Sequence, residues 1–157
     1  MPKQYYKVKN YQARRSVGYL LRLNGKLITS HLEAIFVKRD VSFVQWVILM
    51  NLRDKLASTA GELCQRLCHD SGALTRVLDQ MEKRKWIKRK RSKQDRRIVA
   101  LEITAEGLKI TELFLPEVVD VYNNLMADFT QEEADMVVGL LTRLAHKLSQ
   151  PLNISAL

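Results

Sequence analysis

A dense cluster of cationic side chains is the part of this sequence with the clearest chemistry. Between residues 83 and 97, ten side chains are basic and only Asp95 is acidic. The basic residues are Lys83, Arg84, Lys85, Lys88, Arg89, Lys90, Arg91, Lys93, Arg96 and Arg97. Like charges at this density repel one another unless a polyanion neutralises them. A solvated surface is the alternative, but the elements that precede the cluster favour contact with phosphate groups.

An amphipathic helix leads into the cluster. Its apolar residues recur at i, i+3, i+4 and i+7, which predicts one buried stripe, and they are Leu74, Val77, Leu78 and Met81. Ser71, Thr75 and Arg76 then point away from that stripe. Hydroxyl and guanidinium groups near a helix N-terminus suit the major groove of DNA, where arginine can bond two guanine acceptors. An ordinary surface helix is the alternative for this element taken alone.

The order of the neighbouring elements is typical of a winged helix-turn-helix. A helix is predicted over about 59–67, where Thr59 and Glu62 have the spacing of a capping box. After the second helix, a strand begins near Trp86, and a second strand is predicted where Val99, Leu101 and Ile103 alternate. Two helices followed by a hairpin with a basic loop predict a DNA-binding lobe.

These segments together resemble the MarR family of bacterial transcriptional regulators. The resemblance covers about residues 58–107 and is carried by Glu62-Leu63, Thr75-Arg76-Val77, Trp86-Ile87-Lys88-Arg89, Asp95-Arg96-Arg97 and Leu101-Glu102-Ile103-Thr104-Ala105-Glu106-Gly107. It implies a mainly α fold with a small β wing, in which long terminal helices form a dimerisation region.

The resemblance also implies roles for individual residues. Ser71, Thr75 and Arg76 would lie on the recognition helix. Arg97, together with Arg96, would reach the minor groove from the tip of the wing, with Asp95 holding the arginine by an ion pair. The further basic residues expected to contact DNA are Arg89, Arg91 and Lys93. One position departs from the family, because Lys85 stands where members often have a glycine in the left-handed conformation.

The remaining helices are long for a chain of 157 residues. We expect helices over 13–39, 43–55, 105–127 and 131–149, with Pro116 either kinking the third of them or starting a new segment. The predicted organisation is an N-terminal arm and helix over 1–39, a winged helix-turn-helix lobe over 40–104 and C-terminal helices over 105–157. One lobe cannot cover the apolar faces of these helices, so a second copy is predicted to bury them in a two-fold dimer.

Polar residues near the apolar stripe of the first helix are candidates for a ligand pocket. By the resemblance, such a pocket would take a phenolic or aromatic carboxylate effector, and the candidates are Arg15, Arg22, Asn24, His31 and Trp46. The simpler interpretation is that Asn24 and His31 are hydrogen-bonded at a helix interface and that Trp46 belongs to the core.

The two cysteines raise a second possible regulatory chemistry. Cys64 and Cys68 are four residues apart, and Arg66 with His69 would favour the thiolate of Cys68, which makes it the candidate for a redox switch. Packing as small apolar side chains is the favoured interpretation. We expect no metal site, because Cys64, Cys68 and His69 lack the spacing of known zinc ligands.

Composition and missing motifs argue against a membrane protein, a secreted protein and an enzyme. The net charge is +9, no apolar run approaches the roughly 20 residues that span a bilayer, and the N-terminus lacks a secretory signal, so we expect a cytosolic protein with no membrane partner. No catalytic motif and no cofactor-binding loop are present, which argues against an enzyme.

The predicted function is therefore a homodimeric transcriptional regulator that binds double-stranded DNA. We expect a repressor that a small effector releases from a palindromic operator. Three alternatives remain open: a non-specific architectural nucleic-acid-binding protein, a protein-interaction module that docks to an acidic partner, and a thiol-based redox regulator.

Overall fold

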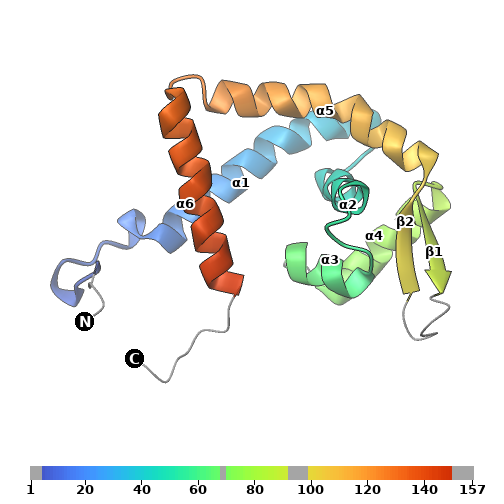
Figure 1. Ribbon diagram of the computed structural model, residues 1–157, viewed down its shortest axis with the longest axis horizontal. Coiled ribbons are helices and arrows are strands. Elements are labelled where there is room, and N and C mark those ends of the chain that lie inside the picture. Colours follow the sequence, from blue (N-terminus) through green and yellow to red (C-terminus); the bar gives the residue numbers. More distant parts are fainter. Residues whose placement is uncertain (1–4, 68–69, 92–98, 150–157) are drawn as a thin grey trace. The chain divides into compact units, whose positions relative to one another are not determined.

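The computed structural model describes residues 5–67, 70–91 and 99–149, and within them the predicted fold class is confirmed (Figure 1). The α-helices are α1 (Val17–Phe36), α2 (Phe43–Arg53), α3 (Ala60–Leu67), α4 (Ser71–Lys83), α5 (Ala105–Leu125) and α6 (Gln131–Ser149). Strands β1 (Ile87–Arg91) and β2 (Val99–Ile103) form the small sheet, and short 3-10 helices are η1 (Val8–Asn10), η2 (Ala13–Arg15) and η3 (Val37–Arg39). The chain forms two compact units, Met1–Val118 and Val119–Leu157, each of which is described by itself.

The first long helix is shorter than predicted. The sequence predicted one helix from Ala13 to Arg39, but α1 is flanked by η2 and η3. Ser16 caps its N-terminus by accepting a hydrogen bond from the Tyr19 amide at 3.3 Å, which fixes the start of the helix. At the other end Asp40 adopts a left-handed conformation with φ 53°, which turns the chain toward α2.

Helix α2 lies within the core of the first unit. It packs against α1 and β2, so more than one of its faces is covered. Ile48, Leu49 and Leu52 are buried together with the predicted Trp46. Phe43, Val47 and Met50 lie on the same apolar helix but are only half-buried.

Side-chain caps begin both helices of the helix-turn-helix, and they include the predicted capping box of Thr59 and Glu62. Asp70 Oδ1 accepts hydrogen bonds from the amides of Gly72 and Ala73, both at 3.0 Å, and thereby starts α4. Before α3, Thr59 and Glu62 bond each other reciprocally at 3.1 and 3.2 Å. The Glu62 carboxylate also accepts from the backbone and then the side chain of Ser58, and these bonds lower its pKa from the ordinary value.

The hairpin is antiparallel and is anchored to the segment that precedes α3. Its register runs from Ile87 opposite Ile103 to Arg91 opposite Val99. The Leu101 amide donates to the carbonyl of Ser58 at 2.7 Å, beside an isolated bridge between Thr59 and Ala100. Because Ile87 and Leu101 are also buried, the base of the hairpin is held firmly in the first unit.

The end of α4 adopts the left-handed turn expected at the position where this sequence has lysine instead of glycine. Lys85 has φ 60°, and its amide donates to the Glu82 carbonyl at 2.9 Å. The Trp86 amide reaches back to the Met81 carbonyl, also at 2.9 Å, which completes a Schellman-type ending. The backbone turn is therefore kept despite the side chain, whose Cβ is unfavourable at positive φ.

Replacing Lys85 with glycine is expected to stabilise the first unit by about 1 kcal/mol, because glycine adopts this conformation without the Cβ penalty. The free energy of unfolding in urea measures the effect. Lys85→Ala is the control, since it removes the charge but keeps the Cβ. If alanine stabilises the protein as much as glycine does, the strain assigned to the left-handed backbone is absent.

Thr104 and Gly107 join the hairpin to α5 and to the end of α4. The Thr104 amide donates to the Trp86 carbonyl at 3.0 Å, and its hydroxyl donates to the Lys85 carbonyl at 2.6 Å. The same hydroxyl oxygen accepts from the Gly107 amide at 3.1 Å, which caps α5. Thr104 and Gly107 of the sequence motif therefore have a structural role, because they connect the hairpin, α5 and the end of α4.

Helix α5 runs without interruption through Pro116. In the second unit, Thr130 and Glu133 form a capping box at the start of α6, with bonds of 3.0 and 3.3 Å. No helix in the described part of the chain is long and apolar enough to cross a membrane.

Candidate nucleic-acid interface

Helix α4 separates buried from exposed residues largely as the sequence predicted, although Val77 of the predicted stripe is only half-buried. Leu74, Leu78 and Met81 are buried, and they anchor the helix in the first unit. Ser71, Thr75 and Arg76 are all exposed at its N-terminal half. The Thr75 hydroxyl donates to the Ser71 carbonyl at 2.8 Å, so its oxygen lone pairs remain available to accept a bond.

The neighbouring elements hold α4 in a fixed position. It packs against α3 on one side and against β1 on the other, as Figure 1 shows for the green helices and the adjacent hairpin. The exposed residues of α4 therefore sit on a rigid element, which is what base recognition requires.

The cations of the hairpin fall into different environments. Lys88 and Arg91 are exposed and make no ion pair with the residues that the structure describes. Lys90 is exposed and pairs with Glu102 across the hairpin at 3.3 Å, an exposed pair of small energetic value. The predicted wing-tip residues Lys93, Asp95, Arg96 and Arg97 lie outside the described residues.

Arg89 is turned toward α4. Its guanidinium lies 2.6 Å from the Asp79 carboxylate and 2.8 Å from that of Glu82, and its own amide donates to Glu82 at 3.3 Å. Partial burial lowers the pKa of Arg89, but the hydrogen bond and charge of Asp79, together with Glu82, outweigh it and raise the pKa above its ordinary value. The sequence analysis missed this cluster, although Asp79 and Glu82 have the i, i+3 spacing that places two side chains on one helix face.

Arg84 links the end of α4 to the turn between α1 and α2. Its guanidinium donates to the carbonyl and to the carboxylate of Asp40, at 2.5 Å each. The same guanidinium lies over the ring of Trp86, 4.8 Å from the centroid. The basic cluster therefore includes arginines that hold the first unit together, which the sequence analysis did not anticipate.

The predicted ligand-binding residues are not brought together around one hollow. Arg15 lies in η2, and Arg22, Asn24 and His31 are exposed along α1. The Asn24 amide donates to the Leu20 carbonyl at 2.8 Å, and His31 Nδ1 lies 2.9 Å from the Leu27 carbonyl. Trp46 is buried, and its Nε1 donates to the Thr111 carbonyl at 3.3 Å.

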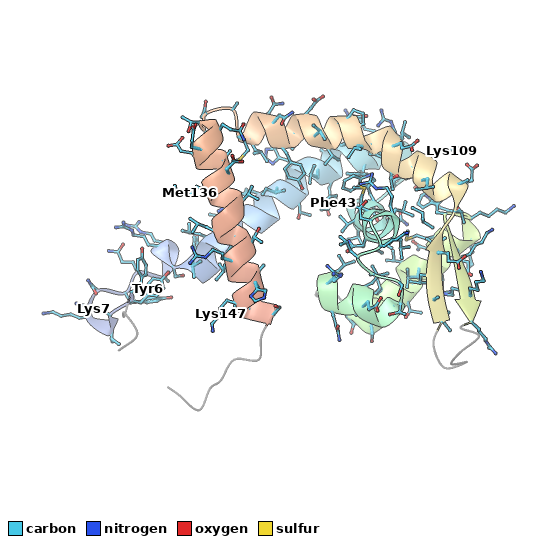
Figure 2. The ribbon with its side chains drawn as sticks, in the orientation of Figure 1. Tyr6, Lys7, Phe43, Lys109, Met136 and Lys147 are labelled. Carbon is cyan, nitrogen blue, oxygen red and sulfur yellow. The ribbon has the colours of Figure 1, made fainter. Side chains whose placement is uncertain are left out.

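An open pocket of about 750 Å³ lies elsewhere, where the end of α1 and the start of α2 face α4. Val37, Val41, Phe43 and Val77 are the apolar part of its lining. Phe43 is labelled in Figure 2 at the start of α2. Glu33, Asp40, Ser42, Gln45, Gln80, Lys83 and Arg84 are the polar part. A compound with an aromatic ring and a charged group matches this mixture of surfaces.

Only one of the candidate redox and metal-binding residues, Cys64, lies within the described part of the chain. Cys64 is a half-buried free thiol, whereas Cys68 and His69 lie outside the described residues. Within the described ranges, no three His, Cys, Asp or Glu side chains are placed to hold a metal ion.

The chain is similar in sequence to known transcriptional regulators. Residues 41–99 match the family model described as "MarR family". The transcriptional repressor YetL of Bacillus subtilis is 31% identical over 129 residues, which are 80% of this chain and 76% of that protein. The transcriptional regulator PecS of Dickeya dadantii is 29% identical over 135 residues, covering 84% and 81% of the two chains.

The fold of this chain is also similar to a solved structure. A mutant of MarR from E. coli complexed with operator DNA has a TM-score of 0.70 and 26% identity to this chain. The match covers 82% of this chain and 92% of that one, so it extends well beyond the helix-turn-helix.

Proposed function

This chain belongs to the MarR family of DNA-binding transcriptional regulators rather than to a class of enzymes, and from that premise we propose that it is a homodimeric repressor of a palindromic operator. In this proposal Ser71, Thr75 and Arg76 read bases in the major groove. Arg91, with Lys93, Arg96 and Arg97 of the loop, contacts phosphates or the minor groove, and Asp95 orients the wing arginine.

The observation that carries the proposal is the division of α4 into a buried and an exposed side. Three residues able to bond bases or phosphates are exposed on a helix whose opposite side is fixed in the core. The exposed cations Lys88 and Arg91 on the adjacent strand supply attraction for the phosphate backbone. YetL is named a repressor, and the E. coli MarR mutant was solved with operator DNA, which supports the same activity here.

The dimer is supported by an uncovered apolar surface on α1. The exposed large apolar residues of this helix are Val17, Tyr19, Leu20, Leu21, Leu23 and Leu27. Folded monomers rarely leave so many large apolar side chains together in water. We propose that a second protomer packs on this surface. A two-fold dimer also suits DNA, because two recognition helices about 34 Å apart would meet successive major grooves of one duplex.

Changing Leu20 and Leu27 together to glutamate is expected to produce monomers, because burying two carboxylates at the dimer interface is unfavourable. Light scattering measures the mass, and operator affinity should fall by about 100-fold or more once the two half-sites are bound independently. The control is Leu56→Glu, which adds a charge at an exposed apolar residue of the first unit away from α1. A double variant that stays dimeric would place the interface elsewhere.

The effector part of the proposal rests on the open pocket beside α4. A bound molecule there would touch Val37 of η3, Phe43 of α2 and Val77 of the recognition helix, so it can favour one placement of α4 over another. In this proposal the ring of an aromatic carboxylate packs on the apolar lining and its carboxylate meets Lys83, because Arg84 is already bonded to Asp40. The test is release of labelled operator by a series of aromatic carboxylates, compared with their non-aromatic counterparts. Equal behaviour of the two series would contradict this assignment.

A further inference from the structure

Arg89 is the basic residue of the hairpin whose surroundings differ most from those of a DNA contact. It lies on β1 between Lys88 and Lys90, so its charge alone does not distinguish it from its neighbours. Lys88, Lys90 and Arg91 are exposed, whereas the Arg89 side chain is only 29% exposed and faces two carboxylates of α4.

The contacts of Arg89 join strand and helix through three bonds. The Glu82 carboxylate accepts from the Arg89 amide at 3.3 Å and from its guanidinium at 2.8 Å. Asp79, one turn earlier on α4, lies 2.6 Å from the same guanidinium nitrogen. Both carboxylates contact the same terminal nitrogen of the guanidinium, and a lysine side chain, which is one bond shorter, does not place its ammonium group at that point.

We propose that Arg89 is a positioning residue that fixes the wing to the recognition helix and does not itself bind a phosphate. The inference rests on the proposed DNA-binding function. Bonding to Asp79 and Glu82 keeps β1 at a set distance and angle from α4, so that both elements meet the duplex together. It also offsets one of the two negative charges that Asp79 and Glu82 place on the recognition helix, which would otherwise repel DNA.

The first test compares lysine and methionine at two positions of the same strand. Arg91 is the matched control, because it lies on the same side of β1 two residues further along and is exposed. A phosphate contact tolerates lysine, so we expect Arg91→Lys to bind a mixed-sequence duplex like the parent and Arg91→Met to lose affinity. At position 89 we expect both Lys and Met to weaken binding by about tenfold, since neither restores the bridge.

In the second test, a purely electrostatic effect and a positioning role predict opposite changes in DNA affinity. In the double variant Asp79→Asn with Glu82→Gln, two negative charges leave the recognition helix. Simple electrostatics predicts tighter binding to DNA, whereas loss of the bridge predicts binding weaker by about threefold to tenfold. All variants are measured well below their thermal midpoints, so that a loss of affinity reports placement of the wing and not unfolding.

The outcomes separate this inference from the proposed function. Rescue of binding by Arg89→Lys, or tighter binding by the double variant, would overturn the positioning role while leaving the DNA-binding function intact. A parent protein that binds no duplex even at low salt would contradict the proposed function and this inference with it.

Discussion

Replacing Gly107 with alanine is expected to destabilise the first unit by about 3 kcal/mol or more, a large effect for one methyl group. A Cβ at this position would lie 2.2 Å from the carbonyl oxygen of Trp86, 2.9 Å from Ile103 Cγ1 and 3.1 Å from Leu49 Cδ2. The closest of these is a backbone atom, and Thr104 holds the same peptide by hydrogen bonds. The hairpin cannot move aside without losing the cap of α5, so the strain is not easily relieved.

Urea unfolding of Gly107→Ala against the parent measures the expected loss. Gly61→Ala is the matched control, because Gly61 lies in α3 and a Cβ there meets nothing within 4 Å. The control is expected to stabilise the protein by about 0.5 to 1 kcal/mol through helix propensity. A Gly107→Ala variant as stable as the parent would show that α5 does not approach Trp86 as closely as described.

Replacing Arg76 with alanine is expected to reduce operator affinity by about 100-fold or more. A bidentate contact from arginine to guanine contributes roughly 1 to 3 kcal/mol, and a dimer loses it in both half-sites. Arg76 is exposed on α4 beside Thr75, and neither of them packs in the core. The loss should therefore appear in recognition and not in the free energy of unfolding.

Competition between operator and random duplex measures this effect. Arg76→Ala should lose far more affinity for operator than for random DNA, because base contacts are absent from non-specific binding. Lys83→Ala, at the other end of the same helix, is the control and should lose the same small factor on both. Equal losses of affinity on both duplexes for Arg76→Ala would show that Arg76 contacts a phosphate and not a base.

Local rules predicted much of the fold because they act over a few residues. The Thr59–Glu62 capping box follows from spacing alone and is present. The same holds for Leu74, Leu78 and Met81 of the predicted stripe on α4. The prediction for α1 was less accurate, since a 3-10 turn and an α-helical turn share the same apolar spacing at their ends.

The parts of the site that depend on long-range pairing were not predictable from spacing. Asp40 and Arg84 are 44 residues apart, and nothing in their local patterns indicates that they meet. For Arg89, a run of basic residues predicts the charge of a surface but not which side of a strand packs on α4. Asn24 and His31 illustrate the same limit, because their seven-residue spacing places them on one side of α1 without indicating what that side covers.

The measurement that tests the central claim most directly is selection from a pool of random DNA duplexes at about 150 mM salt, where non-specific phosphate binding is weakened. The account predicts recovery of a palindrome whose half-sites lie about one helical turn apart, bound by two protomers. Tight binding with no recovered sequence would contradict the account and favour a non-specific architectural protein.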